Sequence, residues 1–467
     1  MTQLVEIPLW LLVLIVLFAA VTFASHFLFP SVRWFFRRRA ERLVSELNKR
    51  LERPIQPFKL ARRHDMIQRL IYDPKVIEAV AHHAKTEGVP ENVAFEQARR
   101  YAREIVPSFS ASAYFGIAIR MARWVSRALY RVRLGYYDET AIAKIDPEAT
   151  VVFVMNHRSN MDYVLVTYLA AERSALSYAV GEWAQVWPLR GLIRAMGAYF
   201  IRRKSRNTLY RRVLARYVQL ATANGVAQAV FPEGGLSLDG TVGEPKLGLL
   251  SYILSDFTPG EGRDVVFVPV AINYDRVLED RVLLEAAEQG ERKFKFHILK
   301  MLGFVGRQIR FKLTGRYHRF GYAAVSFGDP LSLDAFIGDG KHRAEEVGHA
   351  LMERIRDVLP VLPVPLVATV LAETDAGMIR DDMAAKVAET IVRLSKHGAY
   401  VHLPRDSADY ATEVGLRMLV LRGMVTEQDG VYNVNPDERA AITFYAASIA
   451  HLLAEPIDAP AALMPTS

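Results

Sequence analysis

A histidine and an aspartate stand five residues apart just after a short apolar run, and both suit proton transfer. The run covers residues 151–155, and the pair is His157 and Asp162. Histidine titrates near neutrality, so His157 can act as a general base, and a carboxylate on its second ring nitrogen would fix the tautomer and stabilise the imidazolium. The chain has no cysteine and no G-x-S-x-G motif. His157 would therefore activate a hydroxyl that the substrate brings.

The same spacing also fits a structural role. Ser159 and Asp162 match a capping box, in which the acidic side chain binds backbone N–H groups at the start of a helix. A strand end that opens toward a helix is, however, where α/β folds place their chemistry. On spacing alone, the catalytic and the capping interpretations both stay open.

Two further groups of polar residues close apolar runs. Residues 197–203 end in Arg202 and Arg203, whose guanidinium groups suit bidentate binding of a phosphate. The alternative is an ordinary exposed basic surface. Residues 231–235 place Glu233, which could bind substrate hydroxyls, before two glycines that permit close backbone approach. Here the alternative is a tight turn with an exposed glutamate.

Strand-like and helix-like segments alternate from residue 146 to residue 335, which indicates an α/β domain. The proline at position 269 suggests that its strand lies at a sheet edge or carries an irregularity. Apolar runs predict strands over residues 151–155, 198–201, 226–231, 265–272 and 322–327, and periodicity predicts helices over residues 161–171, 208–224 and 248–255.

Taken together, these groups resemble the four sequence blocks of the glycerolipid acyltransferase superfamily, whose first block is H-x4-D. Their order and spacing agree with that family, and the bacterial membrane glycerol-3-phosphate 1-O-acyltransferase branch is the most similar. The resemblance implies an α/β fold with a mixed sheet flanked by helices and with helical extensions at both ends. The matching segments are residues 157–163, 197–203, 233–237, 268–274, 325–330 and 443–451.

The resemblance also implies a reaction and a set of roles. An acyl chain would pass from acyl-CoA or acyl-carrier protein to the sn-1 hydroxyl of glycerol 3-phosphate, without a metal or other cofactor. His157 would be the base and Asp162 its orienting partner. The substrate-binding residues implied by the family blocks are Arg202, Arg203, Glu233, Gly234, Gly235, Ser237 and Pro269.

One position departs from the branch. Leu236 stands where the branch usually carries an arginine that contacts phosphate. Arg194, Lys204 or Lys246 would have to supply that charge. Otherwise the acceptor is dihydroxyacetone phosphate or a lysophospholipid, or the chain is a catalytically silent membrane scaffold.

The N-terminus predicts a membrane anchor over residues 1–32. No charged residue occurs from Ile7 to Val32, a length that can cross a bilayer, and arginines follow from Arg33 onward. A cleaved signal peptide would carry its positive charge ahead of the apolar run, and this chain does not. By the positive-inside rule, the catalytic domain would face the cytoplasm at the inner membrane. The net charge of +8 also favours anionic partners such as membrane lipids.

Residues 33–145 are expected to form a basic juxtamembrane and helical region. A helix start is predicted at Asp73, with Pro74 in the first turn. A second prediction is a helix over residues 111–134 with one stripe of arginines, either lying on the membrane or facing solvent. The stripe consists of Arg120, Arg123, Arg127 and Arg131.

Residues 336–455 predict a helical C-terminal domain with a hairpin that turns at Asp429 and Gly430, followed by a flexible tail over residues 456–467. A helix followed by a hairpin could be a winged helix, which raises nucleic-acid binding as a rival function. Basic residues are few from residue 401 to residue 453, and phosphate contacts dominate nucleic-acid affinity. No nucleic acid is therefore expected as a partner.

Overall fold

The computed structural model divides the described residues into two units, those of residues 8–55 with Ser174 and those of residues 56–171 and 175–467. Within helices, the side chains of residues 19–37, 40 and 189 are not described. The residues that the structure describes are 8–169, 174–181, 185, 189–202, 205, 207–290, 319–338, 344–401, 403 and 407–454.

The first unit contains one long helix, α1 (Leu9–Asn48). Among the described residues, no helix combines the length and the hydropathy that a bilayer span requires. Most of the anchor predicted over residues 1–32 lies outside the description, because residues 1–7 and the side chains of residues 19–37 are not described. The predicted transmembrane helix is therefore not confirmed.

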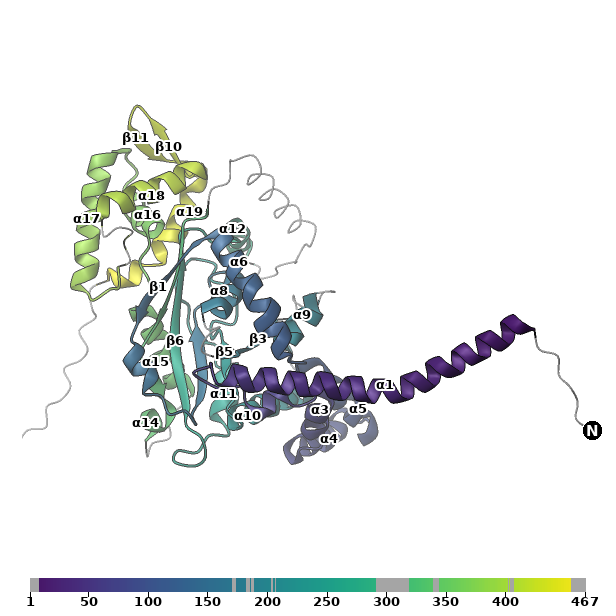
Figure 1. Cartoon of the computed structure of the whole chain (residues 1–467). Helices are drawn as coiled ribbons and strands as arrows, with labels where there is room; N and C mark the ends of the chain where they lie inside the picture. The colour runs from purple at the N-terminus through teal and green to yellow at the C-terminus, as the bar shows by residue number, and fades with distance from the viewer. Residues whose placement is uncertain are drawn as a thin grey trace, which may run out of the picture. The chain divides into compact units, whose positions relative to one another are not determined.

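The second unit is organised around an eight-stranded mixed sheet in the order β1-β7-β6-β2-β5-β3-β4, with β8 paired to β6. Figure 1 labels strands β1, β3, β5 and β6 of this sheet. Five strands run parallel (β2 to β6), whereas β1 and β7 run the other way. All five predicted strands are present, which confirms the mixed α/β fold. The strands are β1 (Arg131–Tyr137), β2 (Thr150–Met155), β3 (Ser177–Gly181), β4 (Tyr199–Ile201), β5 (Gln228–Val230), β6 (Val265–Tyr274), β7 (Tyr322–Phe327) and β8 (Leu331–Ser332).

Strand β2 shows why a continuous apolar run was needed here. Its odd-numbered residues from Val151 to Met155 point into one hydrophobic core, and its even-numbered residues Val152 and Val154 point into a second core on the other face. A parallel strand covered on both faces needs apolar side chains at every position.

Helices cover both faces of the sheet. Residue 73 caps α4 as predicted, because its carboxylate accepts a hydrogen bond from the Lys75 amide at 3.0 Å. One face is covered by α3 (Arg63–Ile71), α4 (Pro74–Glu87), α5 (Glu91–Ile105), α10 (Thr208–Ala223), α11 (Gly248–Leu254), α14 (Leu333–Ile337) and α15 (Ala344–Asp357). The other is covered by α6 (Ile119–Leu129), α8 (Met161–Leu169), α12 (Asp280–Glu288) and the C-terminal helices.

The helix predicted over residues 111–134 is shorter than expected. A π-helical segment, Ser112–Ala118, leads into α6, which ends at Leu129, and β1 follows. Arg131 therefore lies on a strand and does not belong to the helical stripe. The cause is tertiary: β1 pairs in parallel with β7, and this pairing overrides the helical period. The sheet thus begins ahead of residue 146.

Pro269 does not mark an edge strand, because β6 lies between β7 and β2. The irregularity that the proline also suggested is present. On one side of β6 the partner changes from β8, opposite Phe267, to β7, which begins pairing at Val270. The missing N–H of Pro269 falls at this change, while its carbonyl accepts from Gly328 N at 2.8 Å.

The C-terminal region packs onto the sheet as part of the second unit. Its helices share the hydrophobic core that receives Val151, Phe153 and Met155. The predicted hairpin is confirmed, with positive φ at both Asp429 and Gly430 as a type I′ turn requires. The elements are α16 (Pro363–Ala372), β9 (Met378–Ile379), α17 (Arg380–Lys396), α18 (Ala408–Leu421), β10 (Val425–Gln428), β11 (Val431–Val434) and α19 (Arg439–Ala447).

Candidate active site

Several of the residues singled out by the sequence follow the carboxyl ends of neighbouring parallel strands. His157 follows β2, Arg202 follows β4, and Glu233 follows β5. Glu279 comes shortly after the end of β6, at the start of α12. The carboxyl ends of parallel strands meet at one edge of a sheet, which is where α/β folds bind ligands.

His157 and Asp162 are in direct contact. The Nδ1 atom of His157 lies 2.9 Å from Oδ2 of Asp162, and both side chains are almost fully buried, at 2% and 0% exposure. A carboxylate only accepts hydrogen bonds, so Nδ1 carries the proton here and Nε2 is the nitrogen that could take a proton from a substrate. The ring centroid of Phe231 lies 4.2 Å from that of the imidazole, and the ring centroid of Tyr163 lies 5.5 Å from it. These two contacts restrict the orientation of the imidazole ring.

Asp162 also caps helix α8. Its Oδ2 accepts hydrogen bonds from the backbone N–H groups of Arg158 (2.8 Å) and Ser159 (3.0 Å), and its Oδ1 accepts from the Tyr274 hydroxyl at 2.7 Å. The capping interpretation is therefore confirmed, and the same carboxylate also contacts His157, whose catalytic role stays a prediction. The turn that caps the helix is the same turn that places the histidine.

Every backbone N–H from residue 157 to residue 162 has a partner, and all six residues are described. The partners are Glu233 for His157, Asp162 for Arg158 and Ser159, Glu279 for Asn160, the Ser159 hydroxyl for Met161 and the Ser159 carbonyl for Asp162. Such saturation fixes the shape of the turn. In a reaction that develops an oxyanion, the N–H donor to it would have to come from outside this turn.

Glu233 faces the protein backbone. Its Oε1 accepts from His157 N at 2.8 Å and its Oε2 from Gly243 N at 3.3 Å, and the residue is 6% exposed. Burial raises the pKa of Glu233 to about 7, although the two backbone donors and the nearby Arg158 oppose the shift. The expected contact between Glu233 and substrate hydroxyls stays a prediction.

The remainder of this glycine-containing turn also contacts the turn that holds His157. The Ser237 amide donates to the His157 carbonyl at 2.9 Å, while its hydroxyl donates to Thr241 O at 2.8 Å. Gly234 has a φ of 64°, and a Cβ there would lie 2.9 Å from Cδ of Lys246. Gly235 follows in the same bend. The expected substrate contacts of these three residues are untested.

Leu236 is buried in the core, with 9% exposure. Of the residues that could supply the missing charge, Lys204 lies outside the described residues. Arg194 donates to the backbone carbonyls of Arg103 and Glu104. The side chain of Lys246 lies against Gly234, in the turn that holds Leu236.

Arg202 is engaged by an acid. Its Nε and Nη2 donate to the two carboxylate oxygens of Glu104 at 2.9 Å and 2.6 Å, and this pairing raises the pKa of Arg202. The rings of Tyr101 and Tyr210 each lie 5.4 Å from its guanidinium carbon. The side chain keeps 40% exposure. Arg203, its predicted companion, lies outside the described residues.

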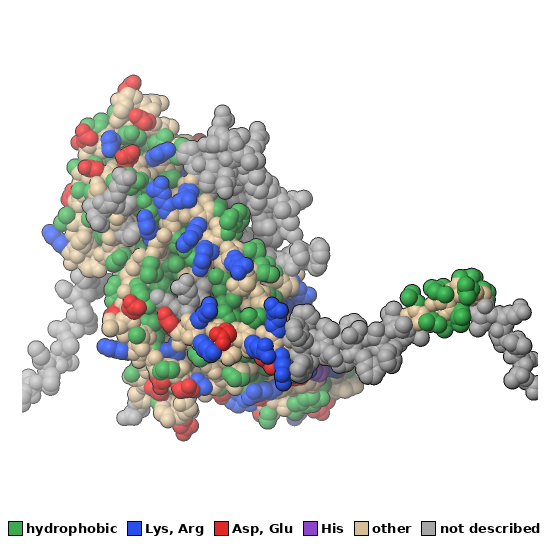
Figure 2. Space-filling view, in the orientation of Figure 1, with side chains coloured by type: hydrophobic (Ala, Val, Ile, Leu, Met, Phe, Trp, Pro, Cys, Tyr) green, Lys and Arg blue, Asp and Glu red, His purple; other side chains and the backbone are tan. Residues whose placement is uncertain are grey.

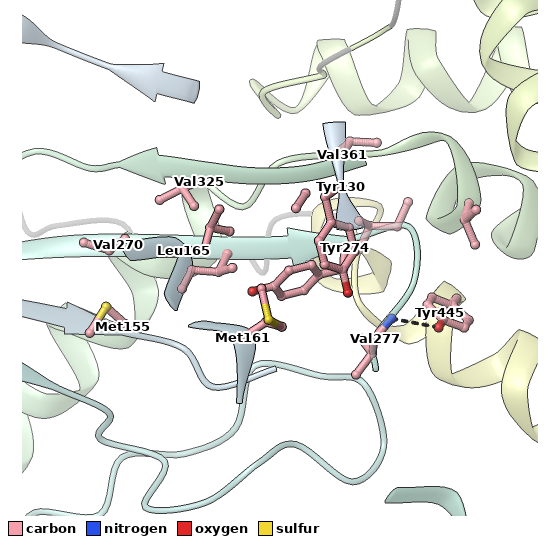
Figure 3. Close-up of a cluster of buried hydrophobic side chains, with 14 of the residues drawn as sticks. Tyr130, Met155, Met161, Leu165, Val270, Tyr274, Val277, Val325, Val361 and Tyr445 are labelled. Atoms are coloured by element: carbon pink, nitrogen blue, oxygen red, sulfur yellow. Dashed lines mark hydrogen bonds between the residues drawn. The ribbon is translucent and has the colours of Figure 1, made fainter. Parts of the chain in front are cut away.

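Three residues that the sequence did not single out support the site. Both atoms of the Asn156 amide bond the backbone of Ile272, which joins the exit of β2 to β6. Tyr274 reaches Asp162 from the end of β6, and Figure 3 shows its ring close to Met161. Glu279 binds the turn at Ser159 and Asn160. Only Tyr274 had a signal, since it ends the fourth family block.

Known proteins resemble this chain in two regions. Residues 137–273 match the family model described as "Acyltransferase", and residues 311–462 match "Glycerol-3-phosphate acyltransferase C-terminal region". Curated relatives named glycerol-3-phosphate acyltransferase include those of Pseudomonas putida (25% identity) and Pseudomonas syringae pv. syringae (26%), each over 90% of this chain and 52% of the relative. The chain thus spans about half the length of the curated relatives it matches.

A solved structure, the 1-acyl-sn-glycerophosphate acyltransferase of Thermotoga maritima, aligns with a TM-score of 0.32 and 18% identity, over 52% of this chain and 76% of that one. The two family models fall on the sheet that carries His157 and Asp162 and on the helices that cover it. The chain is therefore similar to acyltransferases over residues 137–273 and to the C-terminal region of glycerol-3-phosphate acyltransferases over residues 311–462.

Proposed function

We propose that this chain transfers a fatty acyl group from acyl-CoA or acyl-carrier protein to the sn-1 hydroxyl of glycerol 3-phosphate. The observation that carries the proposal is the buried hydrogen bond between His157 and Asp162 at the carboxyl edge of the sheet. The family match that contains this pair and the second match after it supply the reaction class. The relatives' names supply the acceptor.

The residues present account for the proton movements of such a transfer. Nε2 of His157 takes the proton of the acceptor hydroxyl as its oxygen attacks the thioester carbonyl. The tetrahedral oxyanion then collapses, the carbon–sulfur bond breaks, and the imidazolium returns the proton to the leaving thiolate. Asp162 stabilises the imidazolium between these steps. A thioester is already reactive, so His157 and Asp162 need no nucleophile from the protein.

The acceptor phosphate requires positive charge near the carboxyl ends of β4 and β5. Arg202 supports this role because it keeps 40% exposure and has nitrogen donors beyond the two that bind Glu104. Position 236 is a leucine here, whereas related sequences usually carry an arginine. The side chain of Lys246 lies against Gly234, which supports the proposal that this lysine supplies the missing positive charge. If neither serves, dihydroxyacetone phosphate or a lysophospholipid is the acceptor.

A direct assay separates these possibilities. Purified protein in detergent receives labelled long-chain acyl-CoA with glycerol 3-phosphate, dihydroxyacetone phosphate or lysophosphatidate, and His157→Ala is the control. Product with glycerol 3-phosphate alone, abolished in the variant, is the expected result. Product with a lysophospholipid alone would overturn the acceptor. No product with any acceptor, from either acyl-CoA or acyl-carrier protein, would favour the silent scaffold.

Membrane association belongs to the same proposal, since acyl products partition into lipid. The exposed face of α6 and the segment before it offers Ile117, Met121 and Trp124, at 55%, 49% and 67% exposure, beside a row of arginines. From residue 105 to residue 137 the chain has five arginines and no acidic residue. Figure 2 shows hydrophobic and basic side chains next to each other in this region.

This composition fits the surface of an anionic bilayer. Apolar side chains enter the interface while arginines contact lipid phosphates, which is the usual behaviour of a basic amphipathic helix. The opposite side of α6, with Ile119 and Ala122 buried, packs toward α8, the helix that carries Asp162. A span over residues 1–32, with the catalytic unit on the cytoplasmic face of the inner membrane, stays a further proposal from the absence of charge between Ile7 and Val32.

A further inference from the structure

The outer half of the catalytic turn is held by an acid from a distant segment. Glu279 accepts the Ser159 hydroxyl at 2.7 Å, the Asn160 amide N–H at 3.2 Å and the Asn160 side-chain nitrogen at 3.1 Å. Three hydrogen bonds therefore fix two consecutive turn residues. Ser159 is also one of the donors to Asp162, so Glu279 and Asp162 hold the turn from opposite sides.

The neighbouring acid, Asp280, is bound by the C-terminal region. It accepts the Tyr445 hydroxyl of α19 at 2.6 Å and the guanidinium of Arg422, which follows α18. The same hydroxyl accepts from Val277 N at 3.0 Å, the contact drawn in Figure 3, and from Arg422 at 2.9 Å. Burial raises the pKa of Tyr445, so its hydroxyl stays a donor to Asp280.

Helix α19 also contacts the turn directly. The Phe444 ring centroid lies 5.3 Å from the guanidinium carbon of Arg158, the residue next to His157. Arg158 is 1% exposed and donates to the carbonyl of Gly240. A Cβ on Gly240 would lie 1.9 Å from the Phe444 carbonyl oxygen, so the loop after Ser237 also packs directly on α19.

We propose that α19 is a positioning element of the acyl-transfer site, acting through Tyr445, Asp280 and Glu279. None of these residues touches the reacting atoms. They hold the turn in the shape in which one carboxylate, Asp162, binds both the backbone of the turn and the imidazole. Looser positioning of a catalytic group costs rate rather than substrate affinity, since small misplacements have large effects on the reaction step. The inference rests on the proposed acyl transfer.

The kinetic test compares Tyr445→Phe and Glu279→Ala with Arg439→Ala. Arg439 lies on the same helix but binds carbonyls at the end of α16, including Leu371 O at 3.1 Å. Each of the first two variants should lower kcat about tenfold with KM within about twofold, and Glu279→Gln, which keeps one acceptor oxygen, should restore most of the rate. The double variant should lose little more than Glu279→Ala, because both changes act through one path. Arg439→Ala should lower Tm and leave kcat near the wild-type value.

A second measurement does not depend on activity. Hydrogen exchange of the peptide that contains residues 157–162 should rise about tenfold in Tyr445→Phe and stay unchanged in Arg439→Ala. Unchanged exchange in Tyr445→Phe, or a loss of kcat that follows Tm equally in all variants, would overturn the inference. If the wild-type chain acylates no acceptor, the proposed function fails, and the exchange data still decide whether α19 holds the turn.

Discussion

Replacing Asp162 by asparagine separates the two duties of this side chain. In the wild type, Oδ2 accepts from His157 Nδ1, Arg158 N and Ser159 N, and Oδ1 accepts from the Tyr274 hydroxyl. An asparagine can place its carbonyl oxygen before the three nitrogen donors and its amide nitrogen toward the hydroxyl oxygen, which can accept. The geometry therefore survives, and only the negative charge is lost.

The size of the expected defect follows from this arrangement. Hydrogen bonds to charged groups contribute about 1.5–3 kcal/mol and those between neutral groups about 0.5–1.5 kcal/mol. Replacing the carboxylate by an amide should therefore weaken the stabilisation of the imidazolium by roughly 1–2 kcal/mol. At about 1.4 kcal/mol per factor of ten, kcat of Asp162→Asn should fall about 5- to 30-fold. The corresponding change in serine proteases costs about 10⁴-fold because the imidazole adopts the wrong tautomer. Here the two backbone donors keep an oxygen facing Nδ1.

The assay is kcat for acyl transfer at saturating donor and acceptor, together with Tm. Tyr274→Phe, which removes one hydroxyl from Oδ1 and leaves the charge, is the matched control and should cost less than tenfold. Asp162→Ala should not fold stably, because four buried donors would lose their acceptor at about 1–3 kcal/mol each. A loss near 10⁴-fold in Asp162→Asn would show that the backbone does not fix the tautomer. An unchanged kcat would show that the carboxylate does not stabilise developing charge.

Three further changes test other features. Burial raises the pKa of Glu233 to about 7 from its usual 4.5, so the contribution of this side chain to stability is present below about pH 4.5 and is lost as pH rises through 7. The Tm of the wild type minus the Tm of Glu233→Gln should therefore fall between pH 5 and pH 8. A difference in Tm that stays constant with pH would contradict the raised pKa. Arg202→Lys cannot keep the bidentate geometry and should raise the KM for glycerol 3-phosphate about tenfold with kcat little changed. The control Arg216→Lys alters the ion pair with Asp73 and should leave this KM unchanged. Equal KM values for the two variants would exclude Arg202 from phosphate binding. Changing Met121 and Trp124 together to serine should lower flotation with vesicles that contain phosphatidylglycerol at least fivefold. Val392 is an apolar residue of similar exposure on α17, and Val392→Ser should have no effect on flotation. Equal flotation of the wild type and both variants would refute membrane contact through α6.

The parts of the fold that local sequence controls were predictable. The apolar runs gave the central strands β2, β6 and β7, and the α4 start followed from Asp73. His157 and Asp162 were predictable as a pair because a single turn joins them. Strand β1 was predicted wrongly as helix, since its conformation depends on pairing with β7, nearly 200 positions away, rather than on its own period.

The support of the site could not be predicted for the same physical reason. Glu279 lies 120 positions from Ser159, and Tyr445 lies 165 positions from Asp280. An acid at a helix start is an ordinary helix signal, and a tyrosine in an amphipathic helix is an ordinary core residue. Only the folded chain shows that Glu279 reaches the turn of residues 157–162 and that Tyr445 binds Asp280, the acid next to Glu279. Conversely, Arg202 fits a phosphate by type, but its bidentate pairing with Glu104 could not be foreseen from two distant segments.

The core shared by the sheet and the C-terminal helices has a consequence for how this protein can diverge. Val151 and Phe153 of β2 belong to the same packed cluster as Leu366 of α16 and Leu416 of α18. Close-packed protein interiors tolerate neither voids nor overlaps without loss of stability. Recombination that exchanged one of the two matched regions with a distant homologue would bring together surfaces that do not interlock. The two regions must therefore be inherited as one unit, with substitutions on one side of the core compensated on the other.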